Sequence, residues 1–164
     1  MEQSARRLLY DWFQARPRAL TALRLSNKVL TVLVYLVYIL LCLALLWQRD
    51  IRLARVLAVP AAVFLSGSWL RAWLNCSRPY ENGGVPPLFH KETRGKSFPS
   101  RHVFSSAVIS FAVGYILPTA GWAMALVTLA VAALRVVGGV HWPRDVLAGL
   151  AYGWGLGLIG FCLL

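Results

Sequence analysis

Cysteines and acidic residues are scarce in this sequence, and both shortages narrow what it can encode. The three cysteines, Cys42, Cys76 and Cys162, have no paired spacing, which argues against a zinc site or a disulfide framework. Only 6 Asp and Glu stand against 17 Lys and Arg, for a net charge of +11. The basic residues fall outside the apolar segments and show no basic and aromatic pattern of a nucleic-acid module. We therefore expect membrane lipids as partners, no nucleic acid, no metal and no cofactor.

The sequence is rich in long apolar runs instead. Hydrophobic residues make up 59% of the 164 residues, and the mean hydropathy is +0.62, too apolar for an ordinary soluble domain. Residues Val29 to Trp47 carry no charge over a length that crosses the bilayer. The long stretch before this run and the absence of a small-x-small exit after it argue against a cleaved signal peptide. The sequence therefore predicts an integral membrane protein.

Four further spans follow from the charge pattern. Val56 to Leu70 lies between two arginines, whose long side chains can extend the span by snorkelling. Residues 103 to 134 carry no charge and are too many for one crossing, and Pro118 with Gly121 divides them. The last span runs from Pro143 to Leu164. We predict an all-α, multi-span transmembrane helical bundle of about five spans, forming one domain over residues 29–164.

Residues 1–28 form a basic amphipathic N-terminal segment in this prediction. Leucines and aromatic residues alternate there with 6 Lys and Arg, which is typical of a helix lying at the membrane interface. Pro17 is expected to break that helix. The alternative is a basic tail that only obeys the orientation rule for membrane proteins.

Three short polar motifs lie at the edges of the apolar spans. They are Arg71 with Arg78-Pro79, then Pro99-Ser100-Arg101-His102, then Arg135 with His141 and Asp145. Five spans put the loop after the second span and the loop after the fourth on the same side of the membrane. The motifs flank the first of these loops and occupy the second, so all three can meet in space. Ionisable residues at such positions tend to mark functional sites.

The residue types in these motifs suit phosphoryl chemistry. Arg71, Arg78 and Arg135 are planar, permanently charged donors that match phosphate oxygens. Ser100 stands where a helix would begin, so backbone N–H groups of the third span could point at the same phosphate. These residues are the candidate phosphate-binding set.

His141, Asp145 and His102 are the candidate catalytic residues. Pro143 favours a helix start, which places Asp145 in the opening turn of the last span. Its carboxylate could accept a proton from one ring nitrogen of His141 and leave the other nitrogen free to attack phosphorus. His102 would then serve as the general acid that protonates the departing oxygen.

The spacing of these residues resembles the type 2 phosphatidic acid phosphatase superfamily, which includes membrane lipid phosphatases. The family pattern is Lys, six residues, Arg-Pro; then Pro-Ser-Gly-His; then Ser-Arg, five residues, His, three residues, Asp. The matching positions are Arg78, Pro79, Pro99, Ser100, His102, Arg135, His141 and Asp145. Arg71 replaces the family's lysine, Arg101 its glycine and Leu134 its serine. The resemblance covers residues 71 to 145 and the surrounding spans.

This resemblance implies a metal-independent hydrolase of a lipid monophosphate or diphosphate, acting through a phosphohistidine on His141. Arg101 adds bulk and charge beside the phosphate, so we include it in the phosphate-binding set and expect it to favour a diphosphate or a larger anionic head group. Candidate substrates are phosphatidylglycerol phosphate, phosphatidic acid, a polyprenyl diphosphate such as undecaprenyl diphosphate, and a phosphorylated lipid A. Residues 80–98 are the expected selectivity element because they lie between two motifs. This loop includes the charged residues Lys91, Glu92, Arg94 and Lys96 and the turn-rich Asn82-Gly83-Gly84.

Two alternatives to a phosphatase remain open at this point. A lipid phosphotransferase would pass the phosphoryl group from His141 to a second lipid in place of water. A lipid-binding or transport-associated membrane protein would keep the fold without turnover, although it has no evident need for His102, His141 and Asp145 together.

The expected location is the cytoplasmic membrane of the cell, and the face that carries the site is open. Of the Lys and Arg residues, 14 lie on the side of the N-terminal segment and 3 lie in residues 49–55, which favours a cytoplasmic site by the positive-inside rule. Family members that recycle polyprenyl diphosphate carriers usually act on the outer face.

Overall fold

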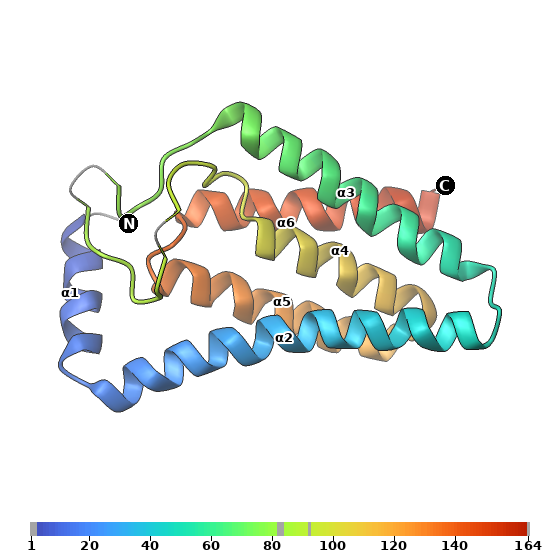
Figure 1. The fold of residues 1–164 in the computed structure, drawn as a ribbon, viewed down its shortest axis with the longest axis horizontal. Helices are drawn as coiled ribbons and strands as arrows, with labels where there is room; N and C mark the ends of the chain where they lie inside the picture. Colours follow the sequence, from blue (N-terminus) through green and yellow to red (C-terminus); the bar gives the residue numbers. More distant parts are fainter. Residues whose placement is uncertain (1–2, 82–83, 92, 164) are drawn as a thin grey trace.

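The structure, a computed structural model, describes residues 3–81, 84–91 and 93–163, and all regular secondary structure in that part is helical. The helices are α1 (Gln3–Gln14), α2 (Pro17–Trp47), α3 (Arg52–Leu74), α4 (Arg101–Ile116), α5 (Pro118–Val137) and α6 (Pro143–Leu158), and a π-helical turn, η1 (Ile159–Leu163), extends α6. Helices α2 to α6 run alongside one another, and α1 lies across one end of them (Figure 1). The predicted all-α bundle is confirmed.

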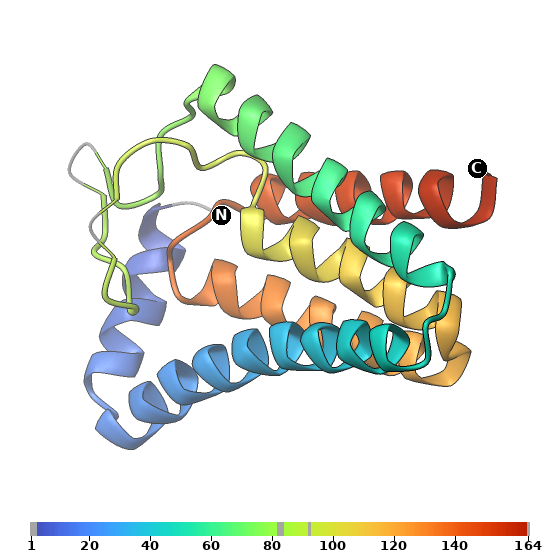
Figure 2. The same ribbon diagram turned by 45° about the vertical axis from the view of Figure 1, so that its right-hand side comes forward.

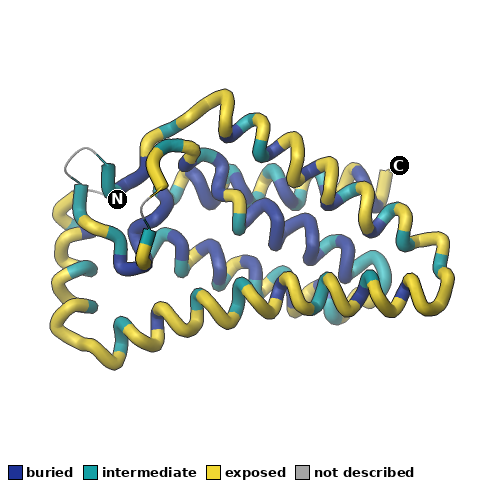
Figure 3. The backbone as a smooth tube through the Cα atoms, in the orientation of Figure 1, coloured by how far each residue is buried: buried dark blue, intermediate teal, exposed yellow. Residues whose placement is uncertain are grey.

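The five predicted spans correspond to helices α2 to α6, although these helices are not equivalent. Four are long and apolar enough to cross a membrane: α2, α3, α5 and α6 with η1. Helix α4 has 16 residues, about 24 Å at ~1.5 Å per residue, and 10 of them are buried. Figure 3 shows α4 as the buried centre, whereas α2 is largely exposed along its length. The third span is therefore a short central helix that the longer helices surround.

The division of the uncharged run 103–134 occurs where the proline predicted it. Helix α4 ends at Ile116, α5 begins at Pro118, and only Leu117 lies between them. Gly114 and Gly121 lie against each other across this turn, because a Cβ on Gly121 would be 2.3 Å from the Cα of Gly114. Two glycines thus allow the antiparallel helices to meet closely at the turn.

The N-terminal segment also breaks as expected. Helix α1 ends at Gln14, and α2 starts with Pro17 in its first turn. Helix α2 then continues through residues 28 and 29 without interruption, so the predicted amphipathic segment comprises α1 and about three turns of α2. Residues 1 and 2 lie outside the described residues. The division into segments 1–28 and 29–164 stays a prediction.

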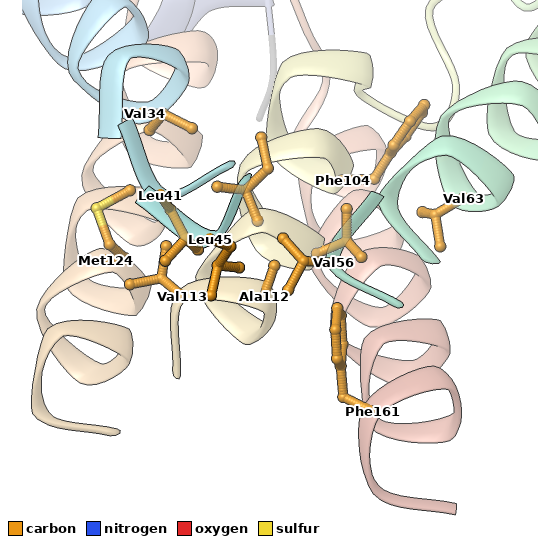
Figure 4. Packing of buried hydrophobic residues seen from close by; sticks show 12 residues of the cluster. Val34, Leu41, Leu45, Val56, Val63, Phe104, Ala112, Val113, Met124 and Phe161 are labelled. Carbon is orange, nitrogen blue, oxygen red and sulfur yellow. The ribbon is translucent and has the colours of Figure 1, made fainter. Parts of the chain in front are cut away.

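The main hydrophobic core lies between α2, α3, α4, α5 and the end of α6. Figure 4 shows its buried side chains, and the labelled ones are Val34, Leu41, Leu45, Val56, Val63, Phe104, Ala112, Val113, Met124 and Phe161. A second cluster, built around Leu23, Leu88, Phe89 and Val140, joins α2 to the loops at the other end. The bundle is therefore packed along its length, and its loops are anchored at the end where α1 lies.

Helix α6 lies against α4 through small residues. A Cβ on Gly153 would be 2.4 Å from the backbone oxygen of Phe104, whereas a Cβ on Gly155 would meet no atom within 4 Å. We expect Gly153→Ala to lower the free energy of unfolding by about 1–3 kcal/mol, because the helices must move apart. Gly155→Ala, the matched control, should leave it equal or raise it by up to about 1 kcal/mol through helix propensity. Unfolding in mixed detergent micelles measures both, and equal losses would contradict this packing.

Candidate active site

The three polar motifs meet at one end of the bundle. Helix α3 ends there, α4 begins there, and α5 connects there to α6 (Figures 1 and 2). One cavity between these elements is lined by Arg71, Arg78, Lys91, Arg101, His102, Arg135, Val140 and His141. The convergence expected from five spans is therefore present. The free volume of this cavity is about 20 Å³.

His141 lies in the short connection between α5 and α6 and is 5% exposed. The backbone N–H groups of Val140 and His141 both donate to the carbonyl oxygen of Arg135 at 3.2 Å. Gly139 precedes them with φ of +72°, a conformation that favours glycine. This tight turn after α5 brings the His141 ring against the cavity, and the backbone of His141 is hydrogen-bonded to that of Arg135.

Asp145 and Ser97 hold the Nδ1 side of the His141 ring. Nδ1 lies 3.4 Å from Asp145 Oδ2 and 3.4 Å from Ser97 Oγ. Ser97 Oγ donates its hydrogen to Asp145 Oδ2 at 2.5 Å, so the serine oxygen can only accept from Nδ1. The carboxylate also only accepts. Both neighbours therefore favour the tautomer with hydrogen on Nδ1, which leaves the lone pair on Nε2.

Asp145 is itself fixed by the start of α6. It occupies the third position of that helix, as predicted, and its Oδ2 accepts a hydrogen bond of 3.0 Å from the backbone N–H of Trp142. The side chain is fully buried. Its Oδ1 lies 3.7 Å from Arg144 Nε and makes no hydrogen bond within the described chain. A helix start thus holds one carboxylate oxygen towards His141 and Ser97.

Arg71 and Arg78 line the cavity and also hold its loops. Arg71 donates through Nη1 to the carbonyl oxygens of Ser97 and Pro99 and through Nη2 to that of Lys96. Arg78 donates through Nε to Gly95, through Nη2 to Lys96 and through Nη1 to Val140, whose oxygen lies 3.1 Å away. Both arginines were predicted as phosphate ligands. The structure shows that part of their donor capacity fixes the backbone around the site.

Arg135 and Ser100 each present a buried polar atom without a partner in the described part of the chain. Arg135 Nη2 donates to Thr31 Oγ1 on α2 at 3.2 Å, but its Nε makes no hydrogen bond. Ser100 is the residue before α4, as predicted, yet its hydroxyl makes no capping hydrogen bond. Its backbone N–H donates to the carbonyl oxygen of Asp145 at 2.8 Å. Unpaired buried polar atoms are costly. Arg135 lines the cavity, so an oxyanion there could pair with its guanidinium, whereas Ser100 is not among the lining residues.

His102 and Arg101 begin α4 at the edge of the cavity. His102 is half-buried in the first turn, the position that the sequence predicted. Arg101 is exposed, and its guanidinium carbon lies 5.9 Å from the centre of the Phe64 ring on α3. Arg101 is therefore the lining cation most open to the surroundings.

Sequence reasoning did not single out Ser97, and it named Lys91 only as part of the selectivity loop. Ser97 is fully buried and bonds to Asp145, and its only signal is its place in the loop two residues before Pro99. Lys91 lies within the expected selectivity loop and lines the cavity with the arginines. Burial lowers the pKa of Lys91, and the charges of Arg78 and Arg135 lower it further. Of the other loop residues named from sequence, Asn82, Gly83 and Glu92 lie outside the described residues.

Burial lowers the pKa of His141 from 6.5 to about 4, with a further contribution from Arg78 and opposition from Asp145. We therefore expect the imidazole to be neutral at pH 7. The unfolded chain takes up a proton near pH 6.5 and the folded site only near pH 4, so this group lowers stability as pH falls between these values. The chain has 3 histidines, so ¹⁵N-histidine spectra assigned with single His→Gln variants can measure the pKa. A midpoint near 6.5 for His141 would contradict the burial.

Among the described residues, no three or more His, Cys, Asp and Glu side chains gather into a metal-binding group. The charges in the cavity are instead those of five basic residues, Arg71, Arg78, Lys91, Arg101 and Arg135. Together with a neutral imidazole and a buried carboxylate behind it, they form a site suited to an anionic phosphate and a nitrogen nucleophile.

Comparisons with known proteins agree with this description. Residues 56–164 match the sequence model of the PAP2 superfamily. A protein of Escherichia coli K12 named as a putative undecaprenyl-diphosphatase, YbjG, is 31% identical over an alignment of 137 residues that covers 80% of this chain. The chain spans 66% of that relative, just under two thirds of its length.

Two solved structures share the fold. LpxE from Aquifex aeolicus aligns with a TM-score of 0.63 and 22% identity over 86% of this chain and 93% of its own. A PAP2 type phosphatidylglycerolphosphate phosphatase from Bacillus subtilis aligns with a TM-score of 0.64 and 22% identity over 94% of this chain and 90% of its own. At this identity the likeness concerns the fold.

Proposed function

This chain belongs to the PAP2 superfamily, and on that basis we propose that it is a multi-pass membrane phosphatase that releases phosphate from a lipid phosphate or diphosphate through a phosphohistidine on His141. The observation that supports this most is the arrangement of His141, Asp145 and Ser97 beside five basic residues in one cavity. It supplies a neutral nucleophile, an orienting carboxylate and a binding site for the phosphate charge. We place the protein in the cell membrane, because its apolar helices and bacterial relatives fit that location.

In the proposed first step, Nε2 of His141 attacks phosphorus and forms the P–N bond while the bond from phosphorus to the lipid oxygen breaks. His102, which carries a second ring proton at the start of this step, donates that proton to the oxygen as it leaves and becomes neutral. Asp145 and Ser97 hold the Nδ1 hydrogen and stabilise the positive charge that develops on the ring. The arginines stabilise the charge spread over the phosphoryl oxygens.

In the proposed second step, water attacks the phosphohistidine. Neutral His102 accepts a proton from this water as the new P–O bond forms. The P–N bond then breaks, its electron pair stays on Nε2, and inorganic phosphate is released. Each turnover thus restores both histidines. No metal takes part in this scheme.

The lipid part of the substrate follows from the surroundings of the site. The cavity opens where apolar spanning helices end, so the phosphate of a lipid can reach it while the chains stay in the bilayer. The relatives' names mention undecaprenyl diphosphate and phosphatidylglycerol phosphate. We propose that this chain acts on a lipid of the same broad class.

Phosphate release by the purified protein in detergent tests this function. The assay compares phosphatidylglycerol phosphate, phosphatidic acid, undecaprenyl diphosphate and phosphorylated lipid A, with chelator present and with His141→Ala in parallel. We expect release from at least one lipid that persists with chelator and is lost in the variant. No release by folded protein would contradict a phosphatase, and transfer of labelled phosphate to a second lipid would identify a phosphotransferase.

Arg101 gives a prediction about the head group. It is exposed at the cavity edge where the family usually has glycine, so its guanidinium can contact a second phosphate. We expect Arg101→Gly to lower the ratio of diphosphate to monophosphate turnover about tenfold, the effect of one charge-assisted hydrogen bond. Arg49→Gly, which removes an exposed arginine in the turn between α2 and α3, outside the site loops, is the matched control. An unchanged ratio in Arg101→Gly would show that this residue does not select the head group.

A further inference from the structure

Helix α1 lies outside the region that matches the family model, residues 56–164, yet it carries a buried arginine. Arg6 is 5% exposed, whereas its neighbour Arg7 on the same helix is exposed. An arginine at a membrane surface ordinarily keeps its charged head in water. The burial of Arg6 therefore points to a task within the protein.

The Arg6 guanidinium joins two loops of the candidate site. Nη1 donates to the carbonyl oxygen of Pro79 at 2.7 Å, and Nη2 donates to those of Val85 and Gly139 at 3.4 Å each. Pro79 directly follows Arg78, and Gly139 lies two residues before His141. One side chain from α1 is thus bonded beside a phosphate-binding arginine and beside the proposed nucleophile.

Arg6 also contacts the ring of Trp142, the residue that follows His141 in the chain. The guanidinium carbon of Arg6 lies 5.4 Å from the centre of that ring, within the range of a cation–π interaction. The pKa of Arg6 is lowered by burial, which is the expected effect of removing the charge from water. Arginine stays charged even so, and its acceptors are backbone carbonyl oxygens. Loss of the side chain would leave those oxygens without this donor.

Gly139 makes room for this contact. Its φ is +72°, and a Cβ at this position would lie 3.2 Å from Nη2 of Arg6. The turn that presents His141 is therefore shaped both for its own backbone conformation and for the approach of Arg6. The contact therefore needs both the arginine on α1 and the glycine in the turn before His141.

The rest of α1 is held in place by the second hydrophobic cluster. Tyr10 and Phe13 pack against the cluster that contains Leu88, Phe89 and Val140. Leu8 is 73% exposed on the same helix, which suits contact with the membrane interface. Helix α1 thus lies between the membrane surface and the loops of the site, with Arg6 directed at the loops.

We infer that Arg6 is a positioning residue for the reaction: through Pro79, Gly139 and Trp142 it fixes the placement of Arg78 relative to His141. The inference rests on the proposed phosphohistidine chemistry. Misplacement of reacting groups by about 1 Å can lower a rate by about 100-fold, so removal of this link should slow the phosphoryl transfer itself.

Rapid mixing with a labelled lipid phosphate, followed by acid-free quenching, measures the rate and the amplitude of phosphoenzyme formation. The variants are Arg6→Gln and Arg6→Lys, with Arg7→Gln as the control that removes the same charge from the same helix. We expect Arg6→Gln to form the full amplitude about 10- to 100-fold more slowly. Arg6→Lys, which keeps the charge and can reach one carbonyl, should fall between it and wild type, and Arg7→Gln should match wild type.

Rate and amplitude separate a positioning role from a role in folding alone. A lower amplitude at the wild-type rate would mean that Arg6 only keeps molecules folded, and a wild-type rate in both Arg6 variants would overturn the inference. If Arg6→Gln does not fold, the rate for Arg6→Lys decides between these outcomes. Absence of phosphoenzyme in the wild type would instead contradict the proposed function.

Discussion

We expect His141→Gln to lower phosphate release by about 10⁴-fold or more, the loss that follows removal of a nucleophile or its base from a catalytic unit. Glutamine keeps a polar side chain of similar reach but has no nitrogen lone pair that can attack phosphorus. The loss should be the same for an alkyl phosphate and for nitrophenyl phosphate, because no leaving group can replace the nucleophile. Phosphate release from both substrates is the measurement.

His102→Gln should behave differently if this histidine is the general acid. The expected loss is about 10²- to 10⁴-fold with an alkyl phosphate, whose oxygen needs a proton as it leaves. Nitrophenolate leaves without one, so much of that loss should disappear with nitrophenyl phosphate. His90→Gln, which changes an exposed loop histidine, is the control and should retain activity. If His102→Gln loses the same activity on both substrates, His102 is not the general acid. If His141→Gln keeps its activity, His141 is not the nucleophile.

Asp145→Asn should be the next most damaging change, with a loss of about 10³- to 10⁴-fold by comparison with other histidine–carboxylate pairs. The carboxylate oxygen Oδ2 accepts hydrogen bonds from the Ser97 hydroxyl and the Trp142 N–H, and it lies 3.4 Å from Nδ1 of His141. An amide that turns its NH₂ group towards the ring would favour hydrogen on Nε2 and block the attacking lone pair. Phosphate release measures the loss, and ¹⁵N shifts of the His141 ring report the tautomer.

Ser97→Ala tests how much the serine contributes to orienting the His141 ring when the charge of Asp145 is kept. It removes the acceptor 3.4 Å from Nδ1 but leaves the carboxylate, so we expect a loss of only about tenfold. Ser77→Ala, on an exposed serine of the same loop, is the control. We expect the carboxylate to matter more than the serine. This expectation would be contradicted if Ser97→Ala lost as much activity as Asp145→Asn while the tautomer of His141 stayed the same.

The arrangement of the spans could be predicted from sequence because apolar length, proline and charge each have a direct physical consequence. The break before Pro118 and the start of α6 at Pro143 follow from the missing N–H and fixed φ of proline. The start of α2 at Pro17 could not be read from hydropathy, because the first turns of this helix mix leucines with charged residues. Hydropathy marks where a helix enters lipid, whereas hydrogen bonds decide where it begins.

The site was predictable where spacing along the chain carries the information. Asp145 follows His141 by four residues across the helix start at Pro143, so a contact between them could be inferred from sequence. Ser97, Lys91 and Arg6 reach the site through loop folding and through the packing of α1, and no local pattern encodes those approaches. The second roles of Arg71 and Arg78 as donors to loop carbonyls could not be predicted for the same reason.

The most direct test of the proposed chemistry is to find the phosphorylated residue. The wild-type protein is mixed with a lipid substrate labelled in its phosphate, quenched without acid, and digested for mass spectrometry. We predict a phosphate on His141 that is stable to base, lost in acid, and absent in His141→Gln. A phosphate on another residue, or rapid release of phosphate with no phosphoenzyme at any time, would contradict the phosphohistidine mechanism.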